Sequence, residues 1–330
     1  MPIDWSPLVE IINTHERFVL SSHVRPDADA IGSELGLACA LESLGKNVRI
    51  VNPSEGSANI AFLDPEHRAK KLGAGITADE ARDTDVHIVV DTSAWVQLQD
   101  VGSVLKTTKA KQTVVIDHHV SSDDLGAMEF KETTAAATGE LIYELAQALG
   151  ATLDEQAANA LYCAIATDTG WFRFPSTTSR TMRIAGELID LGAKPHVLYQ
   201  LLYEQHSAAR MQFFGRVLSR MTIETEGRLA YLSVTQQDFK ETGAVPADTE
   251  ELVNQCLRIA GVVAAFIAIE QPNQTVKVSF RSRLGTNVAA VAEQFGGGGH
   301  KQAAGAVLSA PLADALAKVL PLMRQVVTPE

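Results

Sequence analysis

Side chains that bind divalent cations stand at four places in this chain, each at or near the end of an apolar run. The runs 18–20, 86–90 and 113–116 are each followed by such side chains, and a fourth position lies in the segment 164–170. The residues are His23, Asp27, Asp29, Asp91, Asp117, His118, His119 and Asp168. A single Asp after a strand usually caps a helix, whereas four such positions together provide ligands for two metal ions.

The mixture of imidazole nitrogens and carboxylate oxygens indicates which metals the chain could bind. Such a donor set suits Mn²⁺, Mg²⁺, Zn²⁺ or Fe rather than Cu(I). Two divalent ions about 3.5–4 Å apart can stabilise both the attacking and the leaving oxygen of a phosphoryl transfer. Because Asp91 stands alone at the end of its run, it is the best candidate for a carboxylate that bridges two ions. The expected ligands are His23, Asp27, Asp29, Asp91, His118 and Asp168.

The three consecutive residues 117–119 cannot all ligate a metal from a regular strand, because successive side chains point to opposite faces. We therefore expect Asp117 to orient a ligating histidine without touching the metal itself. His119 is better placed to donate to the scissile phosphate or to the leaving oxygen. The expected catalytic residues are His119, Asp117 and Asp91.

These side chains can meet only if the elements that precede them lie side by side. Short β-branched runs alternate with helical patterns, which predicts an α/β domain: a parallel sheet with helices on both faces. In such sheets, ligands bind outside the carboxyl ends of the strands. Asp168 must arrive from the end of a helix, and residues 156–167 have the apolar periodicity for one. The predicted strands are Arg17–Ser22, Val48–Asn52, Val86–Asp91 and Thr113–Asp117.

A second candidate site surrounds the four consecutive glycines at 296–299. Four glycines exceed the need of a helix cap, and they let backbone N–H groups approach a phosphate or a base closely. The segment between residues 274 and 301 contains four basic residues and one acidic residue, Glu293, which gives a local charge of +3. Only one of the two arginines, Arg281 and Arg283, need face the site, where it could bind phosphate with two hydrogen bonds. The expected substrate-binding residues are Arg281, Arg283, Gly297, Gly298, Gly299 and His300.

Taken together, these motifs resemble those of the DHH phosphoesterase superfamily. The first motif is His23-x-x-Pro26-Asp27-x-Asp29-x-x-Gly32-Ser33, and the others are Asp91, Asp117-His118-His119 and Asp168. The segment from Gly296 to Gly305 is similar to the DHH-associated domain of that superfamily. The resemblance implies one metal on His23, Asp27 and Asp91, and a second on Asp29, Asp91, His118 and Asp168.

By length and layout the chain is similar to the branch of nanoRNases and pAp phosphatases, where pAp is adenosine 3′,5′-bisphosphate. The resemblance implies a metal-dependent phosphoesterase that hydrolyses single-stranded RNA or DNA oligonucleotides to mononucleotides and could also convert pAp to AMP. The substrates would be about two to five nucleotides long. The net negative charge of the protein fits such short substrates better than it fits long duplexes. Mn²⁺ is the expected metal, with Mg²⁺, Co²⁺ or Zn²⁺ as alternatives. Competing functions are inorganic pyrophosphatase or exopolyphosphatase, cyclic-dinucleotide phosphodiesterase and, in a different class, a catalytically silent nucleotide-binding regulator.

The bulk properties set outer limits on these interpretations. With 330 residues, of which 46% are hydrophobic, the chain is long enough for two domains with real cores. The expected division is a catalytic domain at 1–190, a helical connector at 191–221 and a smaller α/β substrate-binding domain at 222–330. The net charge of −12 argues against a protein that coats long nucleic acid. Three cysteines without metal-binding spacing, no leader and no membrane-spanning run predict a cytoplasmic protein. The protein could form a homodimer.

Overall fold

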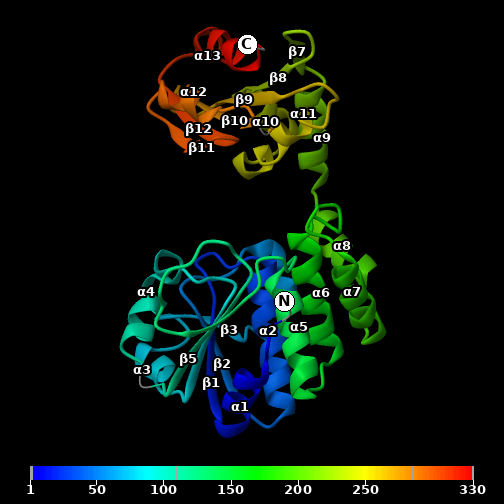
Figure 1. The fold of residues 1–330 in the computed structure, drawn as a ribbon. Helices are drawn as coiled ribbons and strands as arrows, with labels where there is room; N and C mark the ends of the chain where they lie inside the picture. Colours follow the sequence, from blue (N-terminus) through cyan, green and yellow to red (C-terminus); the bar gives the residue numbers. More distant parts are fainter. Residues whose placement is uncertain (1–2, 109, 284, 329–330) are drawn as a thin grey trace. The chain divides into compact units, whose positions relative to one another are not determined.

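The computed structural model describes residues 3–108, 110–283 and 285–328. The chain forms two compact units, Met1–Gln205 and His206–Glu330 (Figure 1). The boundary between them falls inside the stretch 191–221, which the sequence analysis expected to connect two domains.

The first unit is built on a six-stranded sheet in which every neighbouring pair is parallel. The strand order is β3-β2-β1-β4-β5-β6. The strands β2 and β3 lie on one side of β1 and the strands from β4 onward lie on the other, so the strand order reverses between β1 and β4. At such a point the loops after the two strands diverge and leave a crevice where ligands bind. The strands are β1 (Arg17–Ser21), β2 (Asn47–Asn52), β3 (Ala69–Lys71), β4 (Val86–Val90), β5 (Gln112–Asp117) and β6 (Met128–Lys131).

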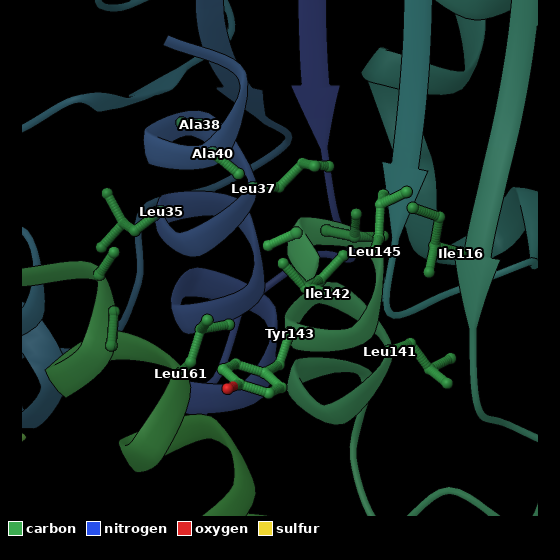
Figure 2. Packing of buried hydrophobic residues seen from close by; sticks show 14 of the residues in the cluster. Leu35, Leu37, Ala38, Ala40, Ile116, Leu141, Ile142, Tyr143, Leu145 and Leu161 are labelled. Atoms are coloured by element: carbon green, nitrogen blue, oxygen red, sulfur yellow. The ribbon is translucent and has the colours of Figure 1, made fainter. Parts of the chain in front are cut away.

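Helices cover both faces of this sheet, as the sequence predicted. One face packs against α2 (Ala28–Ser43) and α5 (Thr138–Leu149), and α6 (Glu155–Asp168) packs on these two helices. The other face packs against α3 (Ala78–Arg82) and α4 (Trp95–Lys106). Figure 2 shows Leu37 and Leu145 from the first face's helices in one cluster with Ile116 of β5. The remaining helices of the unit are α1 (Ser6–Thr14), the 3₁₀ helix η1 (Ala58–Leu63), α7 (Ser179–Asp190) and α8 (Pro195–Tyr203).

Two glycines allow α2 and α6 to lie unusually close together. A Cβ atom on Gly32 would stand 2.4 Å from the carbonyl oxygen of Ala160, and one on Gly36 would stand 2.5 Å from the side chain of Leu161. Both distances are too short for any side chain larger than hydrogen. This contact brings the last residue of α6, Asp168, next to the first turn of α2.

The second unit is a mixed six-stranded sheet in the order β11-β12-β10-β9-β8-β7. Only the β8–β9 pair is parallel, and β7 and β8 form an antiparallel hairpin. One face packs on α12 and α13 and the other on α9 and α11. The strands are β7 (Thr222–Glu224), β8 (Leu229–Val234), β9 (Ala264–Glu270), β10 (Val276–Ser282), β11 (Gly298–His300) and β12 (Ala303–Leu308). The helices are α9 (Ala208–Leu218), α10 (Gln236–Thr242), η2 (Pro246–Thr249), α11 (Leu252–Cys256), α12 (Ala289–Glu293) and α13 (Leu312–Val327).

Within the described ranges, no helix is both long and apolar enough to cross a membrane.

Candidate active site

The first motif follows β1 and opens α2. Asp27 is the N-cap of α2, and its Oδ1 accepts hydrogen bonds from the backbone of Asp29 and Ala30. The same oxygen lies 3.8 Å from Nε2 of His23. Asp27 therefore caps a helix and also faces an imidazole, so the capping role does not exclude a ligand role.

Asp91, directly after β4, lies between two groups of ligand-type side chains. Its Oδ2 is 3.4 Å from His23 Nε2, and its Oδ1 is 3.6 Å from His118 Nε2. Asp91 has a left-handed backbone with φ of 61°, which is uncommon for a residue other than glycine and occurs often at functional sites. The two oxygens of one carboxylate thus face two different imidazoles.

The second group joins α2, α6 and the loop after β5. His118 Nε2 lies 3.7 Å from Asp29 Oδ2 and 3.3 Å from Asp168 Oδ2. This nitrogen is buried and has no hydrogen-bond partner within the described part of the chain. A buried polar atom without a partner is rare, so the atom is suited to a ligand.

Both imidazoles are oriented by backbone carbonyls. His118 Nδ1 lies 3.2 Å from the carbonyl oxygen of Ala135, and His23 Nδ1 lies 3.0 Å from that of Val24. A hydrogen bond to a carbonyl requires a proton on Nδ1, which leaves Nε2 of the neutral ring as a lone pair directed at the carboxylates. Histidines that bind metals are held in this way.

The pKa shifts in the cluster indicate that its buried carboxylates need a positive charge beside them. Burial, together with the charges of Asp91 and Asp168, raises the pKa of Asp29 well above its usual value, and burial also raises the pKa of Asp91. Burial opposes the charged form of His23, but contacts with Asp27 and Asp91 outweigh it and raise the pKa of the ring to about 11. In His118 burial is likewise outweighed, mainly by Asp168, and the pKa rises to about 9. A divalent cation would take over the neutralising role of these protons.

The distances between donor atoms fit divalent ions. Ligand atoms about 2.0–2.2 Å from a metal lie roughly 3–3.6 Å from one another. The donor pairs described above are 3.3–3.8 Å apart. The groups that could each hold an ion are His23, Asp27 and Asp91; Asp29, His118 and Asp168; and Asp91, His118 and His119. Asp91 is shared between the first and the third group.

Asp117 does not orient the ligand-type His118, contrary to the expectation from the sequence. Its Oδ1 accepts hydrogen bonds from Nδ1 of His119 at 2.8 Å and from the backbone N–H of His119 at 3.0 Å. Burial tends to raise the pKa of Asp117, but the hydrogen bonds from His119 and Ser93 outweigh burial and lower it to about 2. The side chain of His119 is 50% exposed, and it borders a cavity of about 450 Å³ that His23, Asp27 and Asp91 also line.

The N-terminus of α5 supplies groups that the sequence analysis missed. The backbone N–H groups of Thr138 and Gly139 donate to the two oxygens of Asp29 at 2.8 and 2.9 Å. The hydroxyl of Thr138 donates to Asp91 Oδ1 at 2.8 Å. A helix N-terminus stabilises a carboxylate, so α5 fixes two carboxylates of the cluster at once. A Thr and a Gly at the start of a helix carry no metal-ligand pattern in the sequence.

In the second unit, one side of the outer half of the sheet is exposed and carries two of the expected substrate-binding residues. Arg281 of β10 and His300 of β11 are both paired with Ala303 of the strand between them. Directly paired residues project from the same face, so the Arg and His side chains stand on either side of Ala303, on strands about 10 Å apart. Arg281 donates one hydrogen bond, from Nη1 to the carbonyl oxygen of Phe280.

The other predicted residues of this unit are engaged differently. Arg283 donates to the backbone carbonyls of Val262 and Leu257 at 2.8 and 2.7 Å, so its guanidinium is bonded within the unit. The glycine run was expected to be a cap or a phosphate-binding loop, but residues 298–300 form the edge strand β11. Gly297 and Gly299 pack against β12, where a Cβ atom would come within 2.1 and 2.5 Å of carbonyl oxygens. Gly298 meets nothing within 4 Å on its open side.

The fold and the cluster define a class: an α/β protein with Asp and His side chains gathered for divalent metals at the carboxyl edge of a parallel sheet. Residues 17–165 match the DHH family, N-terminal domain, and residues 226–328 match the DHHA1 domain. The bifunctional oligoribonuclease and PAP phosphatase NrnA of Bacillus subtilis is 30% identical over 305 residues, which cover 91% of each chain. NrnA of Thermus thermophilus is 31% identical over 314 residues, covering 94% of this chain and 90% of that protein.

A solved structure shares the complete architecture. The crystal structure of an exopolyphosphatase-related protein from Bacteroides fragilis matches with a TM-score of 0.78 at 24% identity, covering 97% of this chain and 96% of that one. This likeness shows the shared fold, and the two sequence relatives show the family. The chain belongs to the DHH family and is a phosphoesterase, with a DHH domain followed by a DHHA1 domain.

Proposed function

We propose that the protein hydrolyses short single-stranded oligonucleotides to mononucleotides and also converts pAp to AMP. The observation that carries the proposal is the position of Asp91, whose two carboxylate oxygens face His23 on one side and His118 on the other. Support comes from the two relatives named as bifunctional oligoribonucleases and PAP phosphatases, which align over nine-tenths of the chain.

The proposed ligands divide between the two oxygens of Asp91. His23 and Asp27 would hold one divalent ion with Asp91, and Asp29, His118 and Asp168 would hold a second with it. When bound, two such ions supply electrostatic stabilisation of the attacking and leaving oxygens of a phosphoryl transfer. Thr138 and Gly139 keep the carboxylates in place, because their hydrogen bonds fix Asp29 and Asp91 before any ligand binds.

His119 is the proposed donor to the scissile phosphate or to the leaving oxygen. Its Nδ1 is committed to Asp117, and the ring is half exposed at the catalytic cavity. A donor in this position places a proton where negative charge develops during the reaction. Asp117 acts through His119 and is therefore a positioning residue.

Manganese is the metal that we propose, with Mg²⁺, Co²⁺ and Zn²⁺ as alternatives. Two of the proposed ligands are imidazoles, and imidazole nitrogens favour Mn²⁺, Co²⁺ and Zn²⁺ over Mg²⁺. The four carboxylates keep the site oxygen-rich, which also suits Mn²⁺.

The second unit would hold the nucleotide portion of the substrate. Arg281 and His300 flank Ala303 on an exposed face, and the small residues between them leave room for a phosphate or a base. Arginine can grip a phosphate with two hydrogen bonds. In this proposal Arg283 supports the unit through its two carbonyl contacts, and of the two arginines Arg281 touches the substrate.

A substrate panel separates this function from its competitors. With added Mn²⁺, the dinucleotide pApA and pAp should be hydrolysed faster than a long single strand, cyclic di-AMP or pyrophosphate. A preference for pyrophosphate or polyphosphate would favour the function in the name of the Bacteroides fragilis protein. Bound metal without turnover of any compound would indicate a nucleotide-binding regulator.

A further inference from the structure

We propose that Lys131 is a positioning residue for the phosphoesterase reaction: it fixes His119 through Asp117 and ties together the two loops beside the catalytic cavity. Lys131 is the last residue of the edge strand β6 and is paired with Asp117 of β5. The inference rests on the proposed function, since it assigns a part in that reaction to a residue outside the metal ligands.

The ammonium group of Lys131 is held by three partners. Its Nζ lies 2.9 Å from Ser93 Oγ and 2.7 Å from the carbonyl oxygen of Ser121. The third partner is Asp117, whose Oδ2 lies 3.3 Å away. Three N–H donors meet three acceptors, and the side chain is only 15% exposed. A lysine that gives up most of its hydration needs such a complete set of contacts.

Asp117 is fully buried and is held on both oxygens. Oδ2 accepts from Ser93 Oγ at 2.7 Å and faces Lys131, whereas Oδ1 serves His119 alone. Because Lys131 and Ser93 occupy Oδ2, the carboxylate cannot turn away from the imidazole. Lys131 thereby determines where the ring of His119 stands, although it does not touch that ring.

The same lysine joins two loops. Ser93 belongs to the loop after β4, which begins with Asp91, and Ser121 belongs to the loop after β5, which carries His118 and His119. Both loops line the cavity of about 450 Å³ next to the metal ligands. The contact is reinforced by a hydrogen bond from the backbone of Asp123 to the carbonyl oxygen of Ser93 at 2.7 Å.

These contacts predict an effect on the chemical step and not on binding. Displacement of a reacting group by about 1 Å can lower a rate on the order of 100-fold. Lys131→Gln removes the charge and shortens the side chain, so we expect kcat to fall about 10- to 100-fold. The metal content and the KM for pApA should stay within about threefold, since Lys131 is not one of the proposed ligands. Lys131→Arg, which keeps the charge and the reach, should recover most of kcat.

The experiment measures kcat, KM and bound Mn²⁺ for the full-length protein with pApA and with bis-p-nitrophenyl phosphate. Lys111→Gln is the control, because Lys111 is 68% exposed and its ion pair with Asp85 is 3.9 Å long. That variant should match the unchanged protein. If the unchanged protein cleaves only the minimal ester, the oligonucleotide proposal fails while the role of Lys131 is still measured on that ester.

A double-mutant cycle separates positioning from a general loss of structure. In the background of His119→Ala, adding Lys131→Gln should lower kcat by less than about threefold, because the group that Lys131 positions is already gone. Full additivity of the two losses would overturn the proposal, as would an unchanged kcat in Lys131→Gln alone. If Lys131→Gln does not fold, Ser93→Ala takes its place in the same cycle with the same two outcomes.

Discussion

Replacement of Arg281 by alanine should raise the KM for a dinucleotide while leaving the cleavage of a minimal ester nearly unchanged. Arg281 stands on the exposed half of the sheet in the second unit, in register with Ala303 and His300. Among the residues that the structure describes, its guanidinium makes one hydrogen bond, from Nη1 to the carbonyl oxygen of Phe280. The remaining donors of the guanidinium can bind a phosphate, so the substitution removes substrate contacts and few internal ones.

The size of the effect follows from the strength of a hydrogen bond to a charged group. Such a bond contributes about 1.5–3 kcal/mol, which corresponds to a loss of about 10- to 150-fold in kcat/KM. Most of the loss should appear in KM, because the proposed contact is with the nucleotide portion of the substrate and not with the reacting phosphate, and kcat should fall less.

The assay compares pApA with bis-p-nitrophenyl phosphate under saturating Mn²⁺. Arg283→Ala is the matched control, since its guanidinium is bonded to the carbonyls of Val262 and Leu257. That variant should lower the melting temperature of the protein and change the KM for pApA little. Equal losses on both substrates in Arg281→Ala would refute recognition by this face and leave the glycine-rich strand with a structural role only.

Three further predictions concern the metals, the donor and the core. Excess EDTA followed by dialysis should abolish hydrolysis of pApA, and Mn²⁺ should restore it at least as well as Mg²⁺; full activity without metal would contradict the mechanism. His119→Ala should lower kcat and leave Mn²⁺ content nearly unchanged, whereas loss of metal in proportion to activity would make His119 a ligand. Burial lowers the pKa of His87 to about 4, so below pH 6.5 the unfolded chain binds a proton that the folded protein does not. Between pH 8 and pH 5, the free energy of unfolding measured in urea should fall by about 2 kcal/mol more in the unchanged protein than in His87→Asn. An equal fall in both proteins would refute this prediction.

The sequence predicted the parts of the fold that hydrophobic patterns specify. The strands that end near His23, Asp91 and Asp117 were found to within one or two residues, because buried parallel strands are continuous β-branched runs bounded by polar residues. The edge strands β3 and β6 were missed, since short strands with one exposed face carry little hydrophobic signal. The cluster of ligand-type residues could be anticipated for the same reason: strand ends converge in a parallel sheet.

What the sequence could not predict depends on contacts between distant residues. Asp117 was expected to orient a ligating histidine, but the loop turns so that Nδ1 of His119 donates to its carboxylate, and the carbonyl oxygen of Ala135 orients His118. The glycines at 297 and 299 were expected to let a ligand approach the backbone, whereas in the structure they allow close packing against β12. No sequence motif surrounds Lys131, and its contact with Asp117 forms only because β5 and β6 lie side by side.

The most direct test of the account is the number of manganese ions bound per chain, measured by equilibrium dialysis together with turnover of pApA. Because the two oxygens of Asp91 face His23 and His118, we expect two ions per chain and an activity that rises with occupancy of both sites. Asp91→Asn should bind fewer ions and lose activity by several orders of magnitude, because one carboxylate serves both groups. A single bound ion in the active protein, or two ions and full turnover in Asp91→Asn, would contradict a shared two-metal centre.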